Sequence, residues 1–294
     1  MGGRPTVNQP TLLLDGFGIL ESPVVGDAGG LYFSDVQAGG VHLLRGGETT
    51  TVVPHRRGIG GIARCQDGSL LVTGRNISRR TVDGAGAVVC GNDPDGGVSS
   101  FNDVAVDRFG RVYVGALNLR PPTPEGVAGP ASVVLVDNDA TVRVVATGLR
   151  FPNGMGFTVE DDRLLVVDSE YASVLSFRVE PDGALSDRRV VARWDDAVPD
   201  GLAVARDGTV WVAVAAEHGG FVDVLDPDGH SCHRIGFAEP VVTNVAFGDN
   251  GSAVLYVTTG SGRESPGTGR LYVCAVDTPG VRIRRAAISP AVEG

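Results

Sequence analysis

Four oxygen-bearing side chains recur in similar surroundings along this chain: Glu21, Asn102, Asn153 and Asp200. Each is followed by a short run of small and apolar residues, then by a polar turn and a second β-type run. Carboxylates that are crowded together without a counter-charge repel one another, and burying them unpaired is costly. A set of ligands made only of oxygen atoms selects hard divalent ions such as Ca²⁺, Mg²⁺ or Mn²⁺. If the fold brings these residues together, the sequence predicts a metal site.

The phrase that holds these residues occurs six times, at intervals of 39 to 51 residues. Its equivalent positions are Glu21, Gly60, Asn102, Asn153, Asp200 and Thr243. Such a period fits four short strands with their turns, which is the size of one propeller blade. Asp-Gly pairs between the two runs of a phrase, as at Asp67-Gly68 and Asp207-Gly208, are typical of hairpins.

No amphipathic helix of ten residues or more is evident. The sequence therefore predicts an all-β, six-bladed β-propeller with a central metal channel, forming a single domain over residues 1–294. In a propeller the equivalent position of every blade converges on the channel, so residues far apart in sequence would meet there.

Charge, cysteine spacing and hydropathy argue against several classes of partner and site. The formal net charge is −10 and no basic stripe is present, which argues against a nucleic-acid partner. The four cysteines are widely spaced and form no CxxC pair, as expected of reduced thiols rather than of a structural zinc site. No apolar run is long enough for a signal peptide or a membrane span, so we expect a cytoplasmic protein.

A Pro/Gly-rich insertion at residues 117–130 is either a substrate lid or a passive loop.

Several motifs together identify a resemblance. Glu21-Ser-Pro followed by Leu31-Tyr-Phe-Ser-Asp35, Phe101-Asn-Asp103, Phe151-Pro-Asn-Gly154 and Pro199-Asp-Gly201 resemble the gluconolactonase/regucalcin (senescence marker protein) family, which also contains luciferin-regenerating enzyme. The resemblance spans essentially the whole chain in the right order. It implies a six-bladed propeller with a divalent cation in its channel, and lactone hydrolysis as the commonest activity.

The resemblance also implies roles for individual residues. Glu21, Asn153 and Asp200 match the metal ligands, and Asn102 matches the residue that contacts substrate and sometimes the ion, with Asp103 beside it. The ion expected first is Ca²⁺, with Mg²⁺, Mn²⁺ or Zn²⁺ as alternatives. Asp200 is the predicted general base, and Asn102 is predicted to orient the carbonyl group or stabilise the oxyanion. The expected substrate is a small lactone or other carbonyl compound.

Two positions depart from the family pattern. The first motif usually reads Glu-Gly-Pro, whereas this chain has Ser22 between Glu21 and Pro23. Members that act on sugar lactones have an Arg two residues before the substrate-binding Asn, and this chain has Ser100 there. Because the cation that would contact sugar hydroxyls or a developing carboxylate is missing, an aldonolactone substrate does not follow from the resemblance.

Other interpretations remain open at this stage. The same metal site can serve dehydration, cyclisation or isomerisation in a biosynthetic pathway, or the propeller can bind a cation without catalysis. Asn153-Gly154 and Asp200-Gly201 can also be ordinary turn formers. His218 is a further acid/base candidate, although a lone His near a loop is more often solvated. His230 and His233 flank Cys232 in a peripheral turn, where surface residues are expected.

Overall fold

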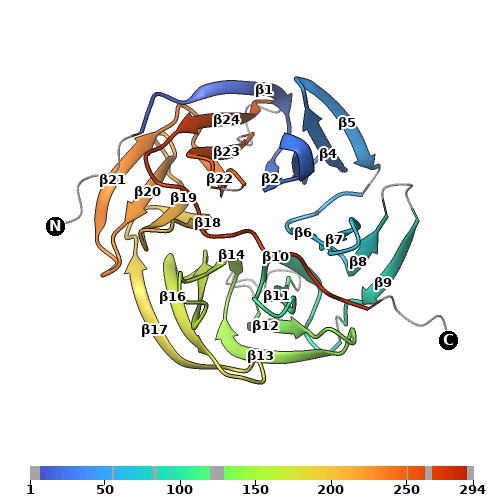
Figure 1. The fold of residues 1–294 in the computed structure, drawn as a ribbon. Helices are drawn as coiled ribbons and strands as arrows, with labels where there is room; N and C mark the ends of the chain where they lie inside the picture. The colour runs from blue at the N-terminus through green and yellow to red at the C-terminus, as the bar shows by residue number, and fades with distance from the viewer. Residues whose placement is uncertain are drawn as a thin grey trace.

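The computed structural model describes residues 7–54, 56–81, 85–93, 95–119, 129–249, 251–261 and 267–289. Six four-stranded antiparallel sheets are arranged around a central axis, as Figure 1 shows. The predicted six-bladed propeller is therefore confirmed. In the described part of the chain the only helical element is the short 3₁₀ turn η1, Asp27–Gly29.

Each blade runs from an innermost strand at the axis to an outermost strand at the rim. The first three blades, innermost strand first, are β2 (Leu20–Val25), β3 (Leu31–Asp35), β4 (Val41–Arg45) and β5 (Glu48–Val53); β6 (Ile62–Arg64), β7 (Leu70–Val72), β8 (Ile77–Arg80) and β9 (Gly86–Cys90); and β10 (Ser100–Val106), β11 (Val112–Leu117), β12 (Ala131–Val136) and β13 (Val142–Leu149).

The fourth to sixth blades, innermost strand first, are β14 (Pro152–Phe157), β15 (Arg163–Asp168), β16 (Ser173–Val179) and β17 (Leu185–Arg193); β18 (Val198–Val204), β19 (Val210–Ala215), β20 (Phe221–Leu225) and β21 (Ser231–Gly236); and β22 (Val241–Phe247), β23 (Val254–Gly260), β24 (Gly269–Ala275) and β1 (Thr11–Phe17). The outermost strand of the last blade comes from the N-terminal part of the chain. The pairing of β1 with β24 closes the ring and leaves no open junction between its two ends.

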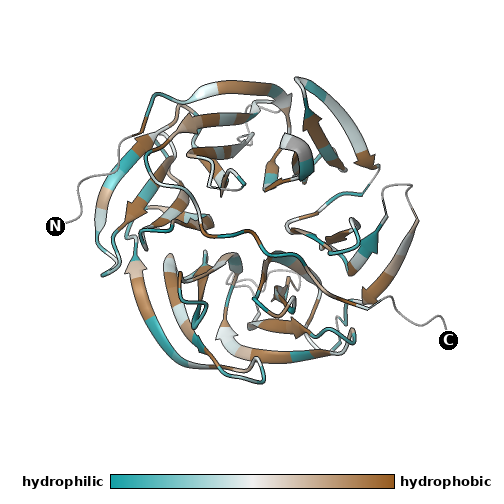
Figure 2. Ribbon diagram, viewed as in Figure 1, coloured by the Kyte–Doolittle hydropathy of each residue, from teal (hydrophilic) through white to brown (hydrophobic). Residues whose placement is uncertain are grey.

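The hydrophobic core lies between neighbouring blades. Trp211 of the fifth blade is fully buried and packs edge-on against Phe247 of the sixth, with ring centroids 5.4 Å apart. Tyr113 and Phe157 join the third and fourth blades in the same way at 5.5 Å. In Figure 2 the outer strands β17 and β21 carry polar patches while apolar colour prevails on the inner strands. This pattern fits a ring of sheets packed face to face, since the inner strands are covered by neighbouring blades while the outermost strands face water.

Five of the six inner strands are irregular at the same place. Their register against the second strand of the blade shifts between Glu21 and Val24, Phe101 and Val104, Pro152 and Met155, Pro199 and Leu202, and Val242 and Asn244. A β-bulge re-aims a side chain and is common next to functional sites. The predicted site residues Glu21, Asn102, Asn153 and Asp200 all lie at these irregularities.

The glycines that follow two of these residues are not turn formers. Gly154 and Gly201 lie inside strands β14 and β18, so the alternative that Asn153 and Asp200 only initiate turns is wrong. A Cβ atom on Gly154 would lie 2.4 Å from the backbone nitrogen of Leu202, and one on Gly201 would lie 2.2 Å from the side chain of Asn244. Both glycines are there because neighbouring inner strands approach closely at the axis.

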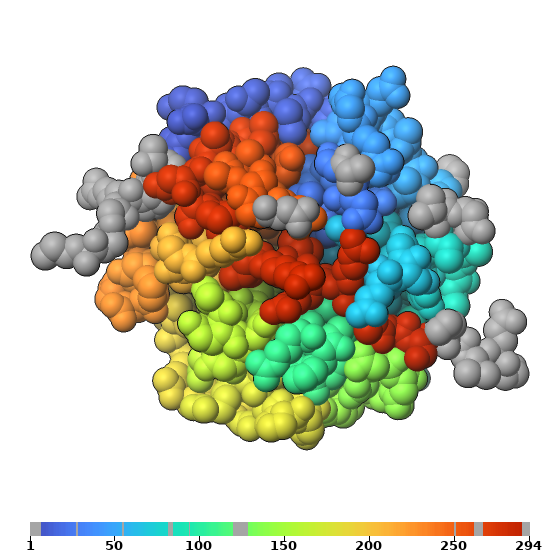
Figure 3. All heavy atoms as spheres, viewed as in Figure 1, coloured from blue at the N-terminus to red at the C-terminus, as the bar shows by residue number. Residues whose placement is uncertain are grey.

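The C-terminal strap, which we define as residues 277–289, crosses the centre of the ring (Figures 1 and 3). Its backbone bonds to residues at the ends of inner strands: the amide of Val281 donates to the carbonyl of Val204 at 3.0 Å, and the amide of Ala286 donates to that of Arg64 at 2.7 Å. The strap therefore spans from the fifth blade to the second. It lies at the channel end opposite to the strand starts that carry Glu21, Asn153 and Asp200.

We expect Gly154→Ala to destabilise the propeller, because the added methyl group meets backbone that cannot move independently of the next blade. The expected loss is about 3 kcal/mol in the free energy of unfolding, measured by denaturant titration. Gly236→Ala is the matched control, since it lies in outer strand β21 and its Cβ would contact nothing within 4 Å. Equal stability of the two variants would contradict the close-packing explanation.

Candidate active site

The predicted site residues converge at the axis. The amide nitrogen of Asn102 donates to Oδ1 of Asn153 at 3.0 Å, and the amide nitrogen of Asn153 donates to Oδ1 of Asp200. Three neighbouring blades are thus joined by side chains 51 and 47 positions apart in the sequence. Asn153 also donates to the hydroxyl of Ser169 at 3.2 Å, which anchors it to the end of the second strand of its own blade.

Asn244 is a site residue that the sequence analysis did not single out. Its amide nitrogen lies 3.3 Å from Oε2 of Glu21 and 3.2 Å from Oδ2 of Asp103, so it bridges two carboxylates across the channel. The repeated phrases could have identified this residue. In the aligned phrases Asn244 occupies the position of Asp103, one residue beyond Thr243. Thr243 itself is buried and bonds to the carbonyl of Leu20 and to Thr258, joining the sixth blade to the first.

Gly60, the equivalent residue of the second blade, contributes space instead of a ligand. A Cβ atom there would lie 2.1 Å from Oδ1 of Asn102. The second blade therefore leaves room for the amide of the third, and the site is assembled from five blades.

Three carboxyl groups share this channel. Glu21 and Asp103 are buried, and Asp200 is half-buried. Burial raises the pKa of Glu21 well above its usual value, and the charges of Asp200 and Asp103 raise it further. Burial and the charge of Asp103 likewise raise the pKa of Asp200. Burial raises the pKa of Asp103 to about 6, against hydrogen bonds from the Val104 amide and from Asn244.

The donor set fits a hard divalent cation. No hydrogen bond or ion pair joins any of the three carboxylates to a Lys, Arg or His among the described residues. The amides that approach them are neutral, so the negative charge has no counterpart, and burial raises the pKa values without a cation to offset it. Carboxylate oxygens with amide carbonyl oxygens are the ligands that Ca²⁺ and Mg²⁺ take in proteins.

Ser22 stands where the first motif of the family usually has glycine, and its backbone conformation shows how the serine is accommodated. It has φ of 49°, a left-handed conformation that glycine adopts without strain, and it lies at the bulge directly after Glu21. Its hydroxyl donates to the carbonyl of Gly60 at 2.7 Å. The serine therefore keeps the glycine-type backbone conformation and adds a bond to the second blade, which leaves the Glu21 position intact.

The remaining candidates lie apart from these contacts. His218 is exposed in the turn after β19 and makes no described contact with the carboxylates. Asp226, Asp228 and His230 bring one ligand atom each within 4.8 Å of the others, but they lie in the β20–β21 turn at the surface. There Oδ1 of Asp226 accepts the amides of Asp228 and His230, as in an ordinary turn. Most of the 117–130 insertion, interpreted as a lid or a passive loop, lies outside the described part of the chain, because residues 120–128 are not described.

A cavity of about 180 Å³ lies between the carboxylates and the strap. Asp103 and Asn244 reach it from the site, and Val281, Arg282 and Ile283 of the strap line its other side. The rest of its wall is mostly apolar, with Val24, Leu202 and Val245 as examples. The strap thus closes the channel below the site.

Around this channel the propeller presents carboxylate and amide groups from five blades. Residues 19–261 match the family model described as the SMP-30/gluconolactonase/LRE-like region. The chain belongs to this family, as the motifs predicted.

Individual relatives agree with that assignment. The chain is 34% identical to the pentonolactonase XacC of Haloferax volcanii over 250 residues, which cover 81% of each chain. It is 29% identical to the 6-deoxy-6-sulfogluconolactonase of Pseudomonas putida, covering 85% of this chain and 88% of that one. Among solved structures, the calcium-binding protein regucalcin of Agrobacterium tumefaciens superimposes with a TM-score of 0.78 at 18% identity, covering 97% and 98% of the two chains. At this identity, the similarity to regucalcin shows only that the two chains share a fold.

No helix in the described ranges is both long and apolar enough to cross a membrane. The four cysteines are all free thiols, two of them buried, as expected of widely spaced residues.

The raised pKa of Asp103 predicts a pH dependence of stability in the presence of a chelator. The folded state holds a proton on Asp103 more tightly than the unfolded state, so stability falls as pH rises from 3.8 to about 6. Asn at position 103 does not titrate, and we expect the stability of Asp103→Asn relative to the parent to rise across that window by about 3 kcal/mol from this group alone. Removing the charge also lowers the pKa of Glu21 and Asp200, which acts in the same direction. Denaturant unfolding at pH 4 and pH 7 measures this difference, and a pH-independent difference would refute it.

Proposed function

We propose that this chain is a divalent-metal-dependent hydrolase that opens a lactone. The observation that carries the proposal is the group of three carboxylates, Glu21, Asp103 and Asp200, gathered at one axis without a cationic partner in the described residues. The names of two relatives, a pentonolactonase and a sulfogluconolactonase, support the reaction class.

The ion would be held by Glu21, Asn153 and Asp200, with Asn102 at its edge, and Ca²⁺ is the ion we propose first. When bound, it supplies Lewis-acid polarisation of the ester carbonyl and positive charge beside the carboxylates. Positive charge favours the ionised form of Asp200, whose pKa is otherwise raised by burial and by Asp103. Only the ionised form can act as a base.

In this proposal Asp200 takes a proton from the attacking water. Its Oδ1 already accepts a hydrogen bond from Asn153, so Oδ2 is the oxygen left for the proton. The water oxygen forms a bond to the carbonyl carbon, the ring C–O bond breaks, and the proton passes from Asp200 to the departing alkoxide. The product is a hydroxy acid, and Asp200 returns to its ionised form.

The existing hydrogen bonds of Asn102 limit how it can stabilise an oxyanion. Its amide nitrogen donates to the carbonyl of Pro152 at 3.2 Å and to Oδ1 of Asn153 at 3.0 Å, which uses both N–H groups. To stabilise an oxyanion, Asn102 must exchange one of these bonds for the substrate oxygen. The longer bond, to Pro152, is the one that costs less to give up.

The proposal also concerns the class of substrate. The Arg that sugar-lactone members use is Ser100 here, at the start of β10. We therefore propose a lactone that needs no cationic contact at that point, and we keep non-hydrolytic carbonyl chemistry at the same site as the second candidate.

The test compares Asp200→Asn with the matched surface variant Asp226→Asn. Hydrolysis of a panel of sugar and aliphatic lactones is measured with chelator and after adding back Ca²⁺, Mg²⁺, Mn²⁺ or Zn²⁺, together with bound metal. We expect chelator to abolish activity and Asp200→Asn to lower kcat by about 100-fold or more with weaker metal retention. Asp226→Asn should behave as the parent, because its carboxylate serves a turn.

The other outcomes discriminate between functions. A metal-replete Asp200→Asn protein with full activity would refute the assignment of the base. Chelator-sensitive melting without turnover of any lactone would favour the non-hydrolytic candidate. Chelator-insensitive melting and no activity would remove the metal from the proposal.

A further inference from the structure

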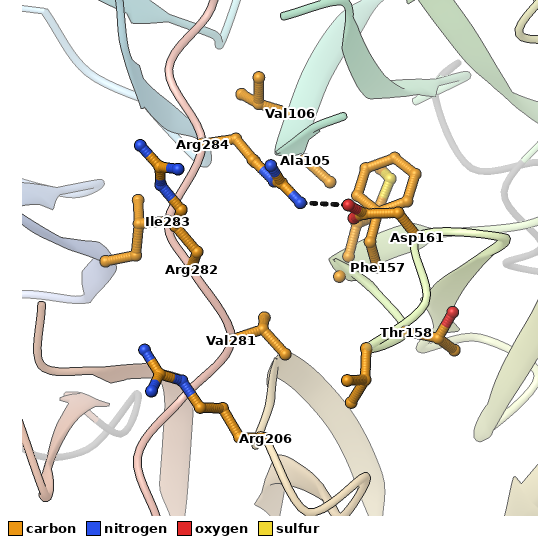
Figure 4. A pocket seen from close by; sticks show the side chains of 13 residues that line it. Ala105, Val106, Phe157, Thr158, Asp161, Arg206, Val281, Arg282, Ile283 and Arg284 are labelled. Atoms are coloured by element: carbon orange, nitrogen blue, oxygen red, sulfur yellow. Dashed lines mark hydrogen bonds and ion pairs between the residues drawn. The ribbon is translucent and has the colours of Figure 1, made fainter. Parts of the chain in front are cut away.

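One hydroxyl group lies beside the proposed metal ligands without being one of them. It belongs to Ser169, which directly follows β15. The strap closes one end of the channel, where its Arg284 pairs with Asp161 of the fourth blade (Figure 4). Ser169 lies at the other end, where the inner strands begin, because the last residue of β15 pairs with the first residue of β14.

The hydroxyl of Ser169 has a single proton, and that proton is already used. Its Oγ donates to the carbonyl of Pro199 in the fifth blade at 2.7 Å. Toward Asn153 the hydroxyl can therefore only accept, and it accepts from the amide nitrogen at 3.2 Å. If the Asn153 amide were flipped, its carbonyl oxygen would face the oxygen of Ser169 with no proton between them. Ser169 thus selects one of the two orientations of this amide.

The selected orientation leaves the carbonyl oxygen of Asn153 available to a cation. The two N–H groups of its amide are directed to Ser169 and to Oδ1 of Asp200. Its Oδ1 accepts a hydrogen bond from Asn102 at 3.0 Å, which uses one of two lone pairs. The second lone pair remains for a ligand bond. Hard divalent cations take oxygen ligands, so only this end of the amide can serve as one.

The equivalent positions in the other two ligand-bearing blades have no hydroxyl. In all three blades the residue before the proposed ligand pairs with the second strand, and the residue after that partner is equivalent in each. These equivalent residues are Ser169 in the fourth blade, Val36 in the first and Ala215 in the fifth. The ligands differ in the same way. Glu21 and Asp200 are carboxylates with two like oxygens, whereas Asn153 has two unlike ends. The hydroxyl therefore occurs where a ligand has to be oriented.

We propose that Ser169 is a positioning residue, which holds the Asn153 amide so that its carbonyl oxygen can bind the cation. Ser169 acts through Asn153 and is not itself a ligand. Its second bond, to Pro199, joins Asn153 to the residue before Asp200 in the next blade. This inference rests on the metal site of the proposed function, but it does not depend on lactone hydrolysis.

Ca²⁺ binding to the metal-free full chain, measured by isothermal titration calorimetry, tests this role. We expect Ser169→Ala to weaken Ca²⁺ binding by about tenfold or more, because Asn153 loses the acceptor that selects its orientation. Ser176→Ala is the matched control and should bind as the parent does. Ser176 is a buried serine in β16 of the same blade, and its hydroxyl accepts from Arg163 at 2.6 Å instead of contacting the site.

A second variant keeps the test valid where Ser169→Ala does not fold. Ser169→Cys is close in size to the parent side chain and replaces the oxygen by sulfur, a weak acceptor. It should weaken Ca²⁺ binding in the same direction as Ser169→Ala.

The Asn153→Asp background gives a readout that a purely structural role of Ser169 would not produce. A carboxylate at this position offers oxygen at both ends, so its orientation no longer matters. In this background Ser169→Ala should leave the Ca²⁺ affinity within about twofold of that of Asn153→Asp alone. A structural role would weaken binding by the same factor in both backgrounds.

The outcomes separate this role from the proposed function. Undiminished Ca²⁺ binding by Ser169→Ala, or an equal loss in both backgrounds, would overturn the role of Ser169 and leave the metal site in place. A parent that binds none of Ca²⁺, Mg²⁺ and Mn²⁺ would overturn the metal site and this inference together. A loss confined to the Asn153 background supports the role of Ser169 even where no lactone is hydrolysed.

Discussion

Repulsion among Glu21, Asp103 and Asp200 is the constraint on which the centre of this molecule depends. Three acidic groups from three blades share one channel, where burial raises the pKa of each and the charges of neighbouring carboxylates raise those of Glu21 and Asp200 further. The protein supplies neutral amides around them, from Asn153 and Asn244 in particular. Neutral donors orient the carboxylates without cancelling their charge. Such a site is stable either with protons on the carboxyl groups or with a cation between them.

Holding these groups at one point places demands on the backbone. A regular strand would point successive side chains to opposite faces, so it could not offer Asn102 and Asp103 to the same channel. The register shift in β10 between Phe101 and Val104 removes that limitation. Glycine is then required where a neighbouring inner segment comes closest to a bulged strand, as at Gly60 and Gly201. The placement of the site residues and the packing of the inner strands therefore depend on each other, which explains why two of the motifs, Asn153-Gly154 and Asp200-Gly201, combine an amide or acidic residue with glycine.

Much of this molecule could be predicted from the sequence because the sequence repeats. Six copies of one phrase define six blades, and their equivalence alone predicts that Asn153 and Asp200 lie together. Asn244 escapes a comparison of one position per phrase, because the bulges bring two consecutive positions into the channel. The turn alternative for Gly154 is wrong for a related reason: Asn-Gly has the same composition whether glycine supplies a positive φ or only lacks a Cβ. The strap could not be predicted, because it has no periodic pattern and its bonds join residues far apart in sequence, such as Val281 and Val204.

The strap changes what the channel can do. A propeller channel is in principle open at both ends, but here one end is crossed by a segment bonded to the second and fifth blades and paired through Arg284 with the fourth. The cavity between the carboxylates and the strap is lined mostly by apolar side chains, and its polar lining residues are Ser22, Asp103, Asn244 and, from the strap, Arg282. Because the strap crosses this end of the channel, access along the axis is left to the face where the inner strands begin.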